Sequence, residues 1–380
     1  MKFVDEFRDG ALAREVAGAI ARAAHPGRRY AFMEFCGGHT HTICKYSLTS
    51  LLPSNVEMIH GPGCPVCVLP IGRLEQAMIL ARRPQVTLAT YGDMMRVPAK
   101  DGHSLLTTKA RGADVRMVYG PAEALKLARA TPHREVVFFA IGFETTTPTT
   151  ALAVKAAAAE GLDNFSVLCN HVLTPAAIGA LLDSEGGAAR LDGFIGPGHV
   201  STIVGTAPYE RFARDYAKPI VVSGFEPLDL LASILMLVRQ RNEGRSEVEN
   251  QYTRAVSRGG NAIAQALIDE VLEVRPTFSW RGLGEIPRSA LRLRERYAPW
   301  DAERKFDAPA PTIADHPACA CPDILRGAKK PRDCRVFGTA CTPESPLGAC
   351  MVSPEGSCAA YNQYGRIRKA EGLVRKDVAT

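Results

Sequence analysis

The sequence has no long apolar run, which excludes a helical membrane protein. No stretch of the 380 residues approaches the roughly 18–20 apolar residues of a membrane-spanning helix. The first residues, MKFVDEFRDG, reach acidic side chains at once and lack the apolar core of a secretory signal. We therefore expect a cytoplasmic protein with no membrane partner. In that compartment, clustered cysteines more often serve metal or redox chemistry than structural disulfides.

Motifs for nucleotides and nucleic acids are missing as well. The chain has no G-x-G-x-x-G and no P-loop, so a tightly bound nucleotide has no support. The net charge of +6 is mild, and no dense basic patch with aromatic platforms is present, which argues against a nucleic-acid partner. There is also only one C-x-x-C, half of what a paired zinc knuckle needs.

Short apolar runs alternate with helical patterns from Tyr30 to about Leu237. Fully apolar strands between helices indicate parallel sheet covered on both faces. The count and length of these units fit two Rossmann-like domains better than one (β/α)₈ barrel. We expect an α/β fold with one domain over residues 1–118, a second over 119–275 and a cysteine-rich unit over 276–380.

Polar and thiol side chains follow the predicted strands. In open parallel sheets, ligands bind beyond the carboxyl ends of the strands. The residues at these ends are Cys36, His60, Cys64, Asp93, Glu144, Asn170, His171, His199 and Glu226. We expect the site at this edge.

Ten of the eleven cysteines fall into two clusters at opposite ends of the chain. The clusters are Cys36, Cys44, Cys64 and Cys67, and Cys319, Cys321, Cys334, Cys341, Cys350 and Cys358. Thiolates are soft ligands and nucleophiles, so this division predicts a metal or cluster site that serves a reactive thiol site. Cys44 lies on an apolar helical stripe and Cys169 in the apolar run FSVLC, so we predict that both are core residues.

Cys36 is the strongest candidate for a reactive thiol. It follows a strand and precedes Gly37, Gly38 and a helical run. A thiol at a helix N-terminus is favoured as thiolate by the dipole and the free N–H groups. His39 or His41 can act as proton acceptor, cationic neighbour or second ligand. A small buried cysteine is the alternative, and the flanking Gly and His residues favour the reactive reading.

The segment Cys64–Cys67 is a C-x-x-C loop that opens a predicted helix. This spacing lets two sulfurs close a disulfide or share one metal ion. Because the chain has no second C-x-x-C, thiol–disulfide exchange is the better interpretation, with Cys64 as the attacking thiol.

The C-terminal block reads C-x-C-x₁₂-C-x₆-C-x₈-C-x₇-C, from Cys319 to Cys358. It is rich in Pro and Gly and poor in apolar periodicity, so a metal centre is expected to supply what the core lacks. Four thiolates suit a [4Fe–4S] cluster, which leaves two cysteines for an adjacent redox disulfide. Spacing alone does not assign the four ligands.

Four motifs resemble those of the HypD family of hydrogenase maturation factors. They are CGGHTH (Cys36–His41), GPGCPVC (Gly61–Cys67), GFETTTPTTA (Gly142–Ala151) and CTPESPLGACMVSPEGSCAAY (Cys341–Tyr361). The resemblance runs nearly end to end. It implies two Rossmann-like domains and a cluster-bearing region similar to ferredoxin:thioredoxin reductase. It also implies a redox-active scaffold on which the Fe(CN)₂CO group of [NiFe]-hydrogenases is assembled, with the small chaperone HypC and with cyanide delivered by HypE.

The resemblance also implies residue roles. Cys36 would hold a transient mononuclear iron with CN and CO ligands, with His39 beside it. Cys64 and Cys67 would form the redox-active pair, and Glu144 would line the cleft facing Cys36. By the reductase analogy, the cluster ligands would be Cys319, Cys334, Cys341 and Cys358, with Cys321 paired to Cys350. The hydrogenase large subunit would be reached only indirectly.

Two other hypotheses compete with the scaffold. The first is a cluster-dependent thiol–disulfide oxidoreductase that acts on protein partners. The second is a zinc-stabilised interaction protein. The CGGHTH motif favours the scaffold hypothesis over the oxidoreductase hypothesis, because a plain reductase does not need this motif. The sequence leaves open whether the protein turns over a substrate as an enzyme.

Overall fold

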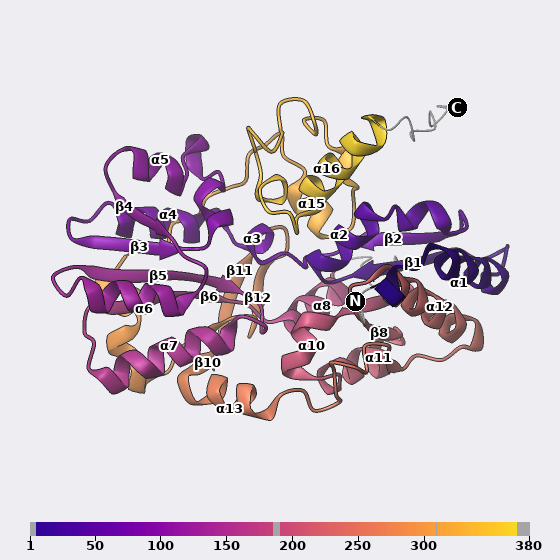
Figure 1. Ribbon diagram of the computed structural model, residues 1–380, viewed down its shortest axis with the longest axis horizontal. Helices are drawn as coiled ribbons and strands as arrows, with labels where there is room; N and C mark the ends of the chain where they lie inside the picture. Colours follow the sequence, from indigo (N-terminus) through magenta and orange to yellow (C-terminus); the bar gives the residue numbers. More distant parts are fainter. Residues whose placement is uncertain (1–4, 185–190, 309, 371–380) are drawn as a thin grey trace.

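Two parallel sheets form the framework of the protein, which the computed structural model describes over residues 5–184, 191–308 and 310–370. Each sheet is the centre of an α/β lobe, and the lobes lie side by side along the long axis (Figure 1). A loop-rich region with the C-terminal cysteines lies next to α2 and α3, where the lobes meet. The predicted α/β class, with two Rossmann-like sheets and a cysteine-rich C-terminal region, is confirmed.

Lobe A is built on a five-stranded parallel sheet with the order β2-β1-β7-β8-β9. Its strands are β1 (Tyr30–Glu34), β2 (Val56–His60), β7 (Gly193–Pro197), β8 (Ile220–Ser223) and β9 (Val248–Asn250). Its helices are α1 (Gly10–Ala23), α2 (Gly37–Lys45), α8 (Thr174–Asp183), α10 (Gly198–Val204), α11 (Glu210–Tyr216) and α12 (Pro227–Glu243). Because side chains alternate along a strand, Phe32 and Ile195 pack toward α1 and α12, whereas Phe194 packs on the opposite face with α8 and α11.

Lobe B is built on a four-stranded parallel sheet with the order β4-β3-β5-β6. Its strands are β3 (Val86–Thr90), β4 (Asp114–Met117), β5 (Glu135–Gly142) and β6 (Phe165–His171). Its helices are α4 (Ile71–Ala81), α5 (Leu105–Ala110), α6 (Pro121–Ala130) and α7 (Thr147–Glu160). Phe139 packs with α4 and α5, and Phe138 with α6 and α7. Helices on both faces explain why these strands are apolar throughout.

The predicted domain boundary at residue 118 is wrong, because strand pairing does not follow chain order. β3 and β4, placed in the first predicted domain, pair with β5 and β6. β7 joins the sheet of β1, with Phe32 opposite Gly193. The chain crosses from lobe A to lobe B through α3 (Pro65–Val68) and returns after β6. The predicted segments 1–118 and 119–275 therefore each contribute to both lobes.

The predicted C-terminal unit begins inside a segment that packs on lobe B. This segment comprises α13 (Ala262–Val271), β10 (Leu272–Val274), β11 (Thr277–Trp280), β12 (Gly284–Pro287), β13 (Leu291–Leu293) and α14 (Ala302–Phe306). β13 and α14 contact β6, and α13 contacts α7. The separate cysteine-rich region begins only after α14, and residues 371–380 of the predicted unit lie outside the described residues.

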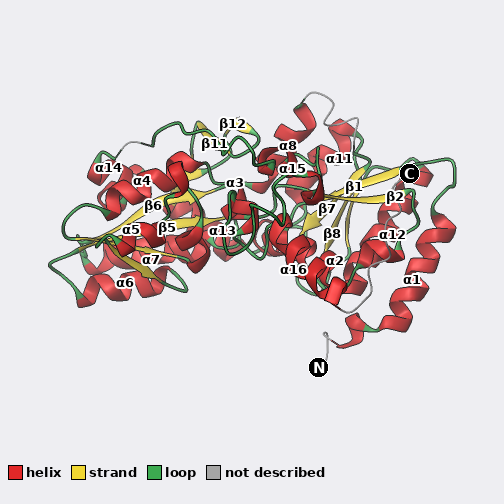
Figure 2. Cartoon of the chain, turned by 90° about the horizontal axis from the view of Figure 1, so that it is seen from above, coloured by secondary structure: helices red, strands yellow, loops and turns green. Residues whose placement is uncertain are grey.

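The cysteine-rich region contains little regular structure. Its helices are α15 (Cys321–Leu325), the 3₁₀ helices η7 (Pro331–Asp333) and η8 (Ala349–Met351), and α16 (Ser357–Ala370). α16 packs on α2, while α15 and η8 contact α3. Seen from above, α3, α15 and α16 lie between the two sheets (Figure 2). Within the described ranges, no helix is long and apolar enough to cross a membrane.

Candidate thiol and metal site

The carboxyl ends of strands from both sheets converge on one cavity of about 360 Å³, which we call the thiol cavity. Lobe A contributes Cys36 after β1 and His199 after β7, and lobe B contributes Asp93 and Thr146. Glu355 reaches the same cavity from the cysteine-rich region. The site therefore needs all three parts of the molecule, and it lies at the sheet edge predicted from the sequence.

Cys36 sits at the N-cap of α2 with extended backbone (φ −147°, ψ 127°). Only 8% of the residue is exposed. Burial raises the pKa of the Cys36 thiol well above its usual value, and the nearby carboxyl of Glu355 raises it further. The N–H groups of Gly38 and His39 at the start of α2 act in the opposite direction but do not compensate. The helix N-terminus therefore does not make Cys36 a thiolate by itself.

Two glycines let the backbone close tightly around Cys36. A Cβ on Gly37 would collide with the side chain of Glu355, and a Cβ on Gly63 would collide with the backbone N of Cys36. CGGHTH and GPGCPVC thus carry glycine where two loops and the cysteine-rich region meet.

His199, not His39, is the ring beside the thiol. Its Nδ1 lies 3.9 Å from Cys36 Sγ, and burial lowers the pKa of His199. His39 is turned toward Ser223, whose carbonyl O lies 3.3 Å from His39 Nε2, and burial lowers the pKa of His39 to about 4. Phe225 stacks on both rings, at centroid distances of 3.7 Å to His199 and 4.8 Å to His39. In the sequence, the position of His199 directly after a predicted strand was the one feature that indicated a place in the site.

Cys64 and Cys67 form a disulfide across the first turn of α3, which we call the N-terminal bridge. Cys64 Sγ also accepts the N–H of Cys67 at 3.2 Å. Both residues are buried, and Pro65 and Val66 between them line the thiol cavity. The bridge therefore lies directly behind one wall of that cavity.

Glu144 does not face Cys36 as the resemblance implied. Its carboxylate accepts the backbone N–H of Thr174 at 2.9 Å and the Thr174 hydroxyl at 3.0 Å, at the first turn of α8. Burial raises the pKa of Glu144 to about 7, against the opposing effect of the Thr174 hydrogen bonds. Its neighbours Phe143 and Thr145 line the thiol cavity instead. Glu144 is placed to fasten α8 to the end of β5.

All six C-terminal cysteines line one enclosed space, which we call the cysteine pocket. Within it, Cys321 Sγ and Cys350 Sγ lie 2.6 Å apart, and we call these two residues the thiol pair. A Cβ on Gly348 would lie 2.5 Å from Cys319 Sγ, so this glycine leaves room for the sulfur. The structure thus brings together the two cysteines that the resemblance paired and groups the other four around them.

The donor set of the cysteine pocket fits an iron–sulfur cluster, whereas its present volume does not. Four thiols remain once the thiol pair is set aside, and thiolates are the usual ligands of such clusters. The pocket measures about 10 Å³, near the minimum for one water molecule. Across the described residues, no three His, Cys, Asp or Glu side chains are arranged around a single metal-ion position. A cluster would therefore require the sulfurs to move apart.

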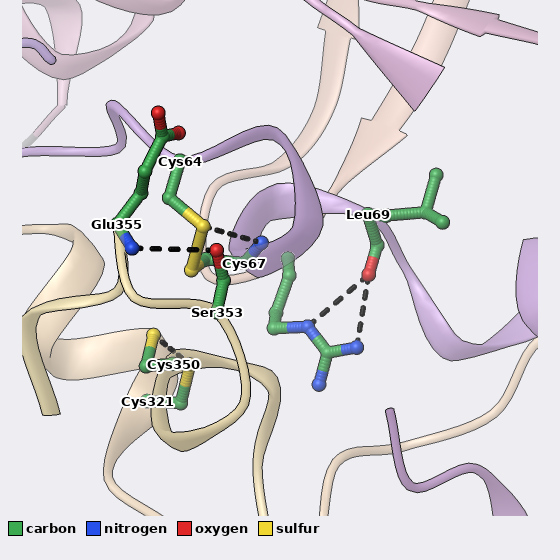
Figure 3. Close-up of a disulfide and its surroundings, with 8 residues drawn as sticks. Cys64, Cys67, Leu69, Cys321, Cys350, Ser353 and Glu355 are labelled. Carbon is green, nitrogen blue, oxygen red and sulfur yellow. Dashed lines mark hydrogen bonds between the residues drawn. A yellow bond between two sulfur atoms is a disulfide. The ribbon is translucent and has the colours of Figure 1, made fainter. Parts of the chain in front are cut away.

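The helices α15 and η8, which carry Cys321 and Cys350, contact α3, whose first turn carries the N-terminal bridge. Arg281 is buried and donates from its backbone to Val68 O at 2.7 Å and from its guanidinium to Leu69 O at 2.9 and 3.2 Å. Glu355 N–H donates to Ser353 Oγ at 3.3 Å and fixes the loop between pocket and bridge. Figure 3 shows the thiol pair and the N-terminal bridge on either side of this loop.

Fold and site together define a class: a two-lobed α/β protein with a buried thiol between its lobes and a cysteine-rich region above them. The model of the Hydrogenase formation hypA family, HypD, matches residues 11–365. Three similar proteins are each named hydrogenase maturation factor HypD. That of Rhizobium leguminosarum bv. viciae is 62% identical over 97% of both chains. That of Azotobacter vinelandii is 61% identical over 99% of this chain and 100% of its own. That of Escherichia coli K12 is 47% identical over 96% and 98%.

The chain therefore belongs to the HypD family, whose members compared above are hydrogenase maturation factors.

Proposed function

We propose that this protein is a redox-active scaffold for [NiFe]-hydrogenase maturation, on which iron receives its CN and CO ligands while Cys36 holds it. One observation carries the proposal: Cys36 presents a free thiol to a cavity of about 360 Å³ between the lobes. A thiolate is a soft donor suited to iron in this state. The cavity leaves space beside the sulfur for small ligands and for a second protein donor.

The iron would be cargo, and the chain's own residues would prepare its place. Cys36 must lose its proton to bind a metal ion, and His199 Nδ1 at 3.9 Å is placed to accept it. Because burial lowers the pKa of His199, its ring is neutral and can take the proton near pH 7. Thr145 also lines the cavity, and its hydroxyl group can donate a hydrogen bond to a cyanide nitrogen.

The cysteine pocket supports the redox part of the proposal. Cys319, Cys334, Cys341 and Cys358 would hold a [4Fe–4S] cluster, which supplies single electrons when bound. The thiol pair, Cys321 and Cys350, is placed for reversible disulfide formation next to them. Opening of the N-terminal bridge by two electrons and two protons would alter the cavity wall at Pro65 and Val66.

Two partners belong to the proposal. A HypC-type chaperone would bring a second thiolate to the iron, and a HypE-type protein would deliver cyanide. The hydrogenase large subunit would receive the product indirectly, and a cytoplasmic location stays part of this proposal. The alternative of a thiol–disulfide oxidoreductase is disfavoured because Cys64 and Cys67 are 3% and 1% exposed, so another protein's disulfide cannot reach them in this state.

Infrared spectroscopy tests the proposal directly. The protein is purified anaerobically together with its small partner, and the spectrum is searched for cyanide and carbonyl stretches on iron. The scaffold predicts both kinds of band. A sample that holds iron–sulfur absorption but shows neither band would overturn the scaffold and favour the oxidoreductase. A colourless sample that holds zinc would overturn both.

A further inference from the structure

A buried carboxyl group lies directly beneath the Cys36 loop. Glu34, the last residue of β1, is 0% exposed. Its Oε2 accepts the backbone N–H of Cys36 at 2.9 Å. Its Oε1 accepts the Thr40 hydroxyl and lies 2.8 Å from Nδ1 of His60. Both oxygens are therefore used, and each partner belongs to the segments that surround the thiol.

The contact continues from His60 into the cysteine-rich region. His60 Nε2 lies 3.1 Å from the hydroxyl of Tyr361, and the two rings meet edge to face with centroids 5.3 Å apart. Tyr361 is on α16, three residues after Cys358. Three successive hydrogen bonds thus run from Cys36 N–H through Glu34 and His60 to α16.

A buried carboxyl group has few stable orientations. Without water, each of its oxygens must accept hydrogen bonds from protein donors. If one donor is removed, the oxygen that it served stays buried without a partner, which costs free energy. Glu34 can therefore hold the Cys36 backbone only while His60 and Thr40 hold Glu34. The Cys36 N–H donates directly to Glu34 Oε2, so this carboxyl group anchors the backbone at the start of α2.

We propose that Glu34 is a positioning residue for the Cys36 thiol, and that α16 sets its orientation through Tyr361 and His60. The loop is thereby tied to the helix that begins beside Cys358. A displacement of α16 when the cysteine pocket opens would reach Cys36 along this chain of hydrogen bonds. The inference rests on the proposed function only in taking Cys36 as the working thiol.

The same helix supplies a matched control. Tyr364 lies one turn further along α16, and its hydroxyl is 2.9 Å from Nε2 of His41. Those two rings also meet edge to face, with centroids 5.2 Å apart. Glu34 is bound by Cys36, Thr40 and His60, so removal of the Tyr364 hydroxyl leaves that carboxyl group untouched.

The test measures alkylation of Cys36 by iodoacetamide in the full-length protein without iron cargo, with the modified peptide quantified by mass spectrometry. Tyr361→Phe should raise the Cys36 rate about fivefold, the factor expected for loss of one net hydrogen bond. Glu34→Gln should raise it further, to about tenfold or more, because the amide cannot accept from all three donors. Tyr364→Phe should stay within about twofold of the parent, because its bond does not include Glu34.

Combined variants separate positioning from general loosening. If the chain is continuous, Tyr361→Phe should add little once Glu34→Gln is present, whereas Tyr364→Phe should act independently. Equal rates for Tyr361→Phe and Tyr364→Phe would overturn the proposal, and this comparison stands even if Glu34→Gln fails to fold. Equal acceleration at the distant Cys169 in Tyr361→Phe would also overturn it, since that indicates global destabilisation.

A spectroscopic readout completes the test. In iron-loaded samples, Tyr361→Phe should shift the cyanide and carbonyl bands, and Tyr364→Phe should leave them in place. Unshifted bands in both variants would count against the proposal. Alkylation is measured without iron, so the two proposals are tested separately. The alkylation rates can contradict the positioning role of Glu34 while the cyanide and carbonyl bands persist. Missing bands can contradict the scaffold function while the alkylation rates still support the positioning role.

Discussion

The two thiol regions are held in different ways. Around the thiol cavity, Cys36, the N-terminal bridge and His199 follow strands of a packed parallel sheet. In the cysteine pocket, Cys319, Cys334 and Cys341 lie in loops, Cys321 and Cys350 lie on the short helices α15 and η8, and α16 carries Cys358. The cavity is open at about 360 Å³, whereas the pocket is nearly closed at about 10 Å³. Regular structure thus holds the thiol cavity open, whereas the proposed cluster would order the loops of the cysteine pocket.

The largest effect is expected from removal of one proposed cluster ligand, which should alter the cysteine pocket and not the thiol cavity. Cys334→Ala should abolish the visible absorption of the anaerobic protein and destabilise the cysteine-rich region, because the proposed cluster would tie its loops together. Absorption and limited proteolysis measure the two effects. Cys169→Ala is the control, since Cys169 lies in β6 of lobe B. An unchanged spectrum would remove Cys334 from the ligand set.

The comparison can be sharpened by destabilising lobe B alone, at a partly buried group of ion pairs. Glu303 on α14 pairs with Arg73 on α4 and with Arg275, the latter at 2.6 and 2.9 Å. Burial opposes ionisation of Glu303, but the two guanidinium groups outweigh it and lower its pKa to about 2. A depressed carboxyl pKa stabilises the fold above the unfolded-state pKa, near 4.5, and this contribution is lost as the pH falls toward 2.

Glu303→Gln should therefore cost on the order of 2 kcal/mol in the free energy of unfolding at pH 7 and much less near pH 2. Denaturant titrations at several pH values measure it. Glu160→Gln is the control, because its pair with Arg129 is exposed and screened by solvent and should contribute little to stability. A loss for Glu303→Gln that does not change with pH would contradict the ion-pair account.

The smallest effect concerns His199, which lines the thiol cavity, and His39, which faces Ser223. His199→Gln should slow iron loading about tenfold because the acceptor of the Cys36 proton is lost. A tenfold change corresponds to roughly 1.4 kcal/mol in the barrier to loading. In the parent, iron loading should also slow as the pH falls and His199 becomes protonated. His199→Gln should lack this step in the pH dependence of loading. His39→Gln should leave the pH step in place. Loss of the step in His39→Gln, with retention in His199→Gln, would restore the assignment made from the sequence.

Local sequence patterns predicted the individual strands better than they predicted which strands pair with one another. Apolar runs such as VTLAT identified buried strands, because a strand covered on both faces must be apolar throughout. The pairing of β1 with β7 depends on a contact between residues about 160 positions apart, which no local period encodes. The predicted boundary at residue 118 failed for this reason.

The same distinction applies to the site. Cys36 and the Cys64–Cys67 motif could be found because their spacing and flanking glycines are local. His39 was assigned by its closeness in sequence, yet the first turn of α2 directs it to Ser223. Glu34 has no such local signal, since its three hydrogen bonds appear only once α2 and β2 are in place.

Infrared and visible spectra of Cys36→Ala beside Cys169→Ala, each purified anaerobically with the small partner, test the central claim most directly. The account predicts that Cys36→Ala loses every cyanide and carbonyl band on iron and keeps its visible absorption, while Cys169→Ala retains both. Cyanide and carbonyl bands that survive in Cys36→Ala would contradict it.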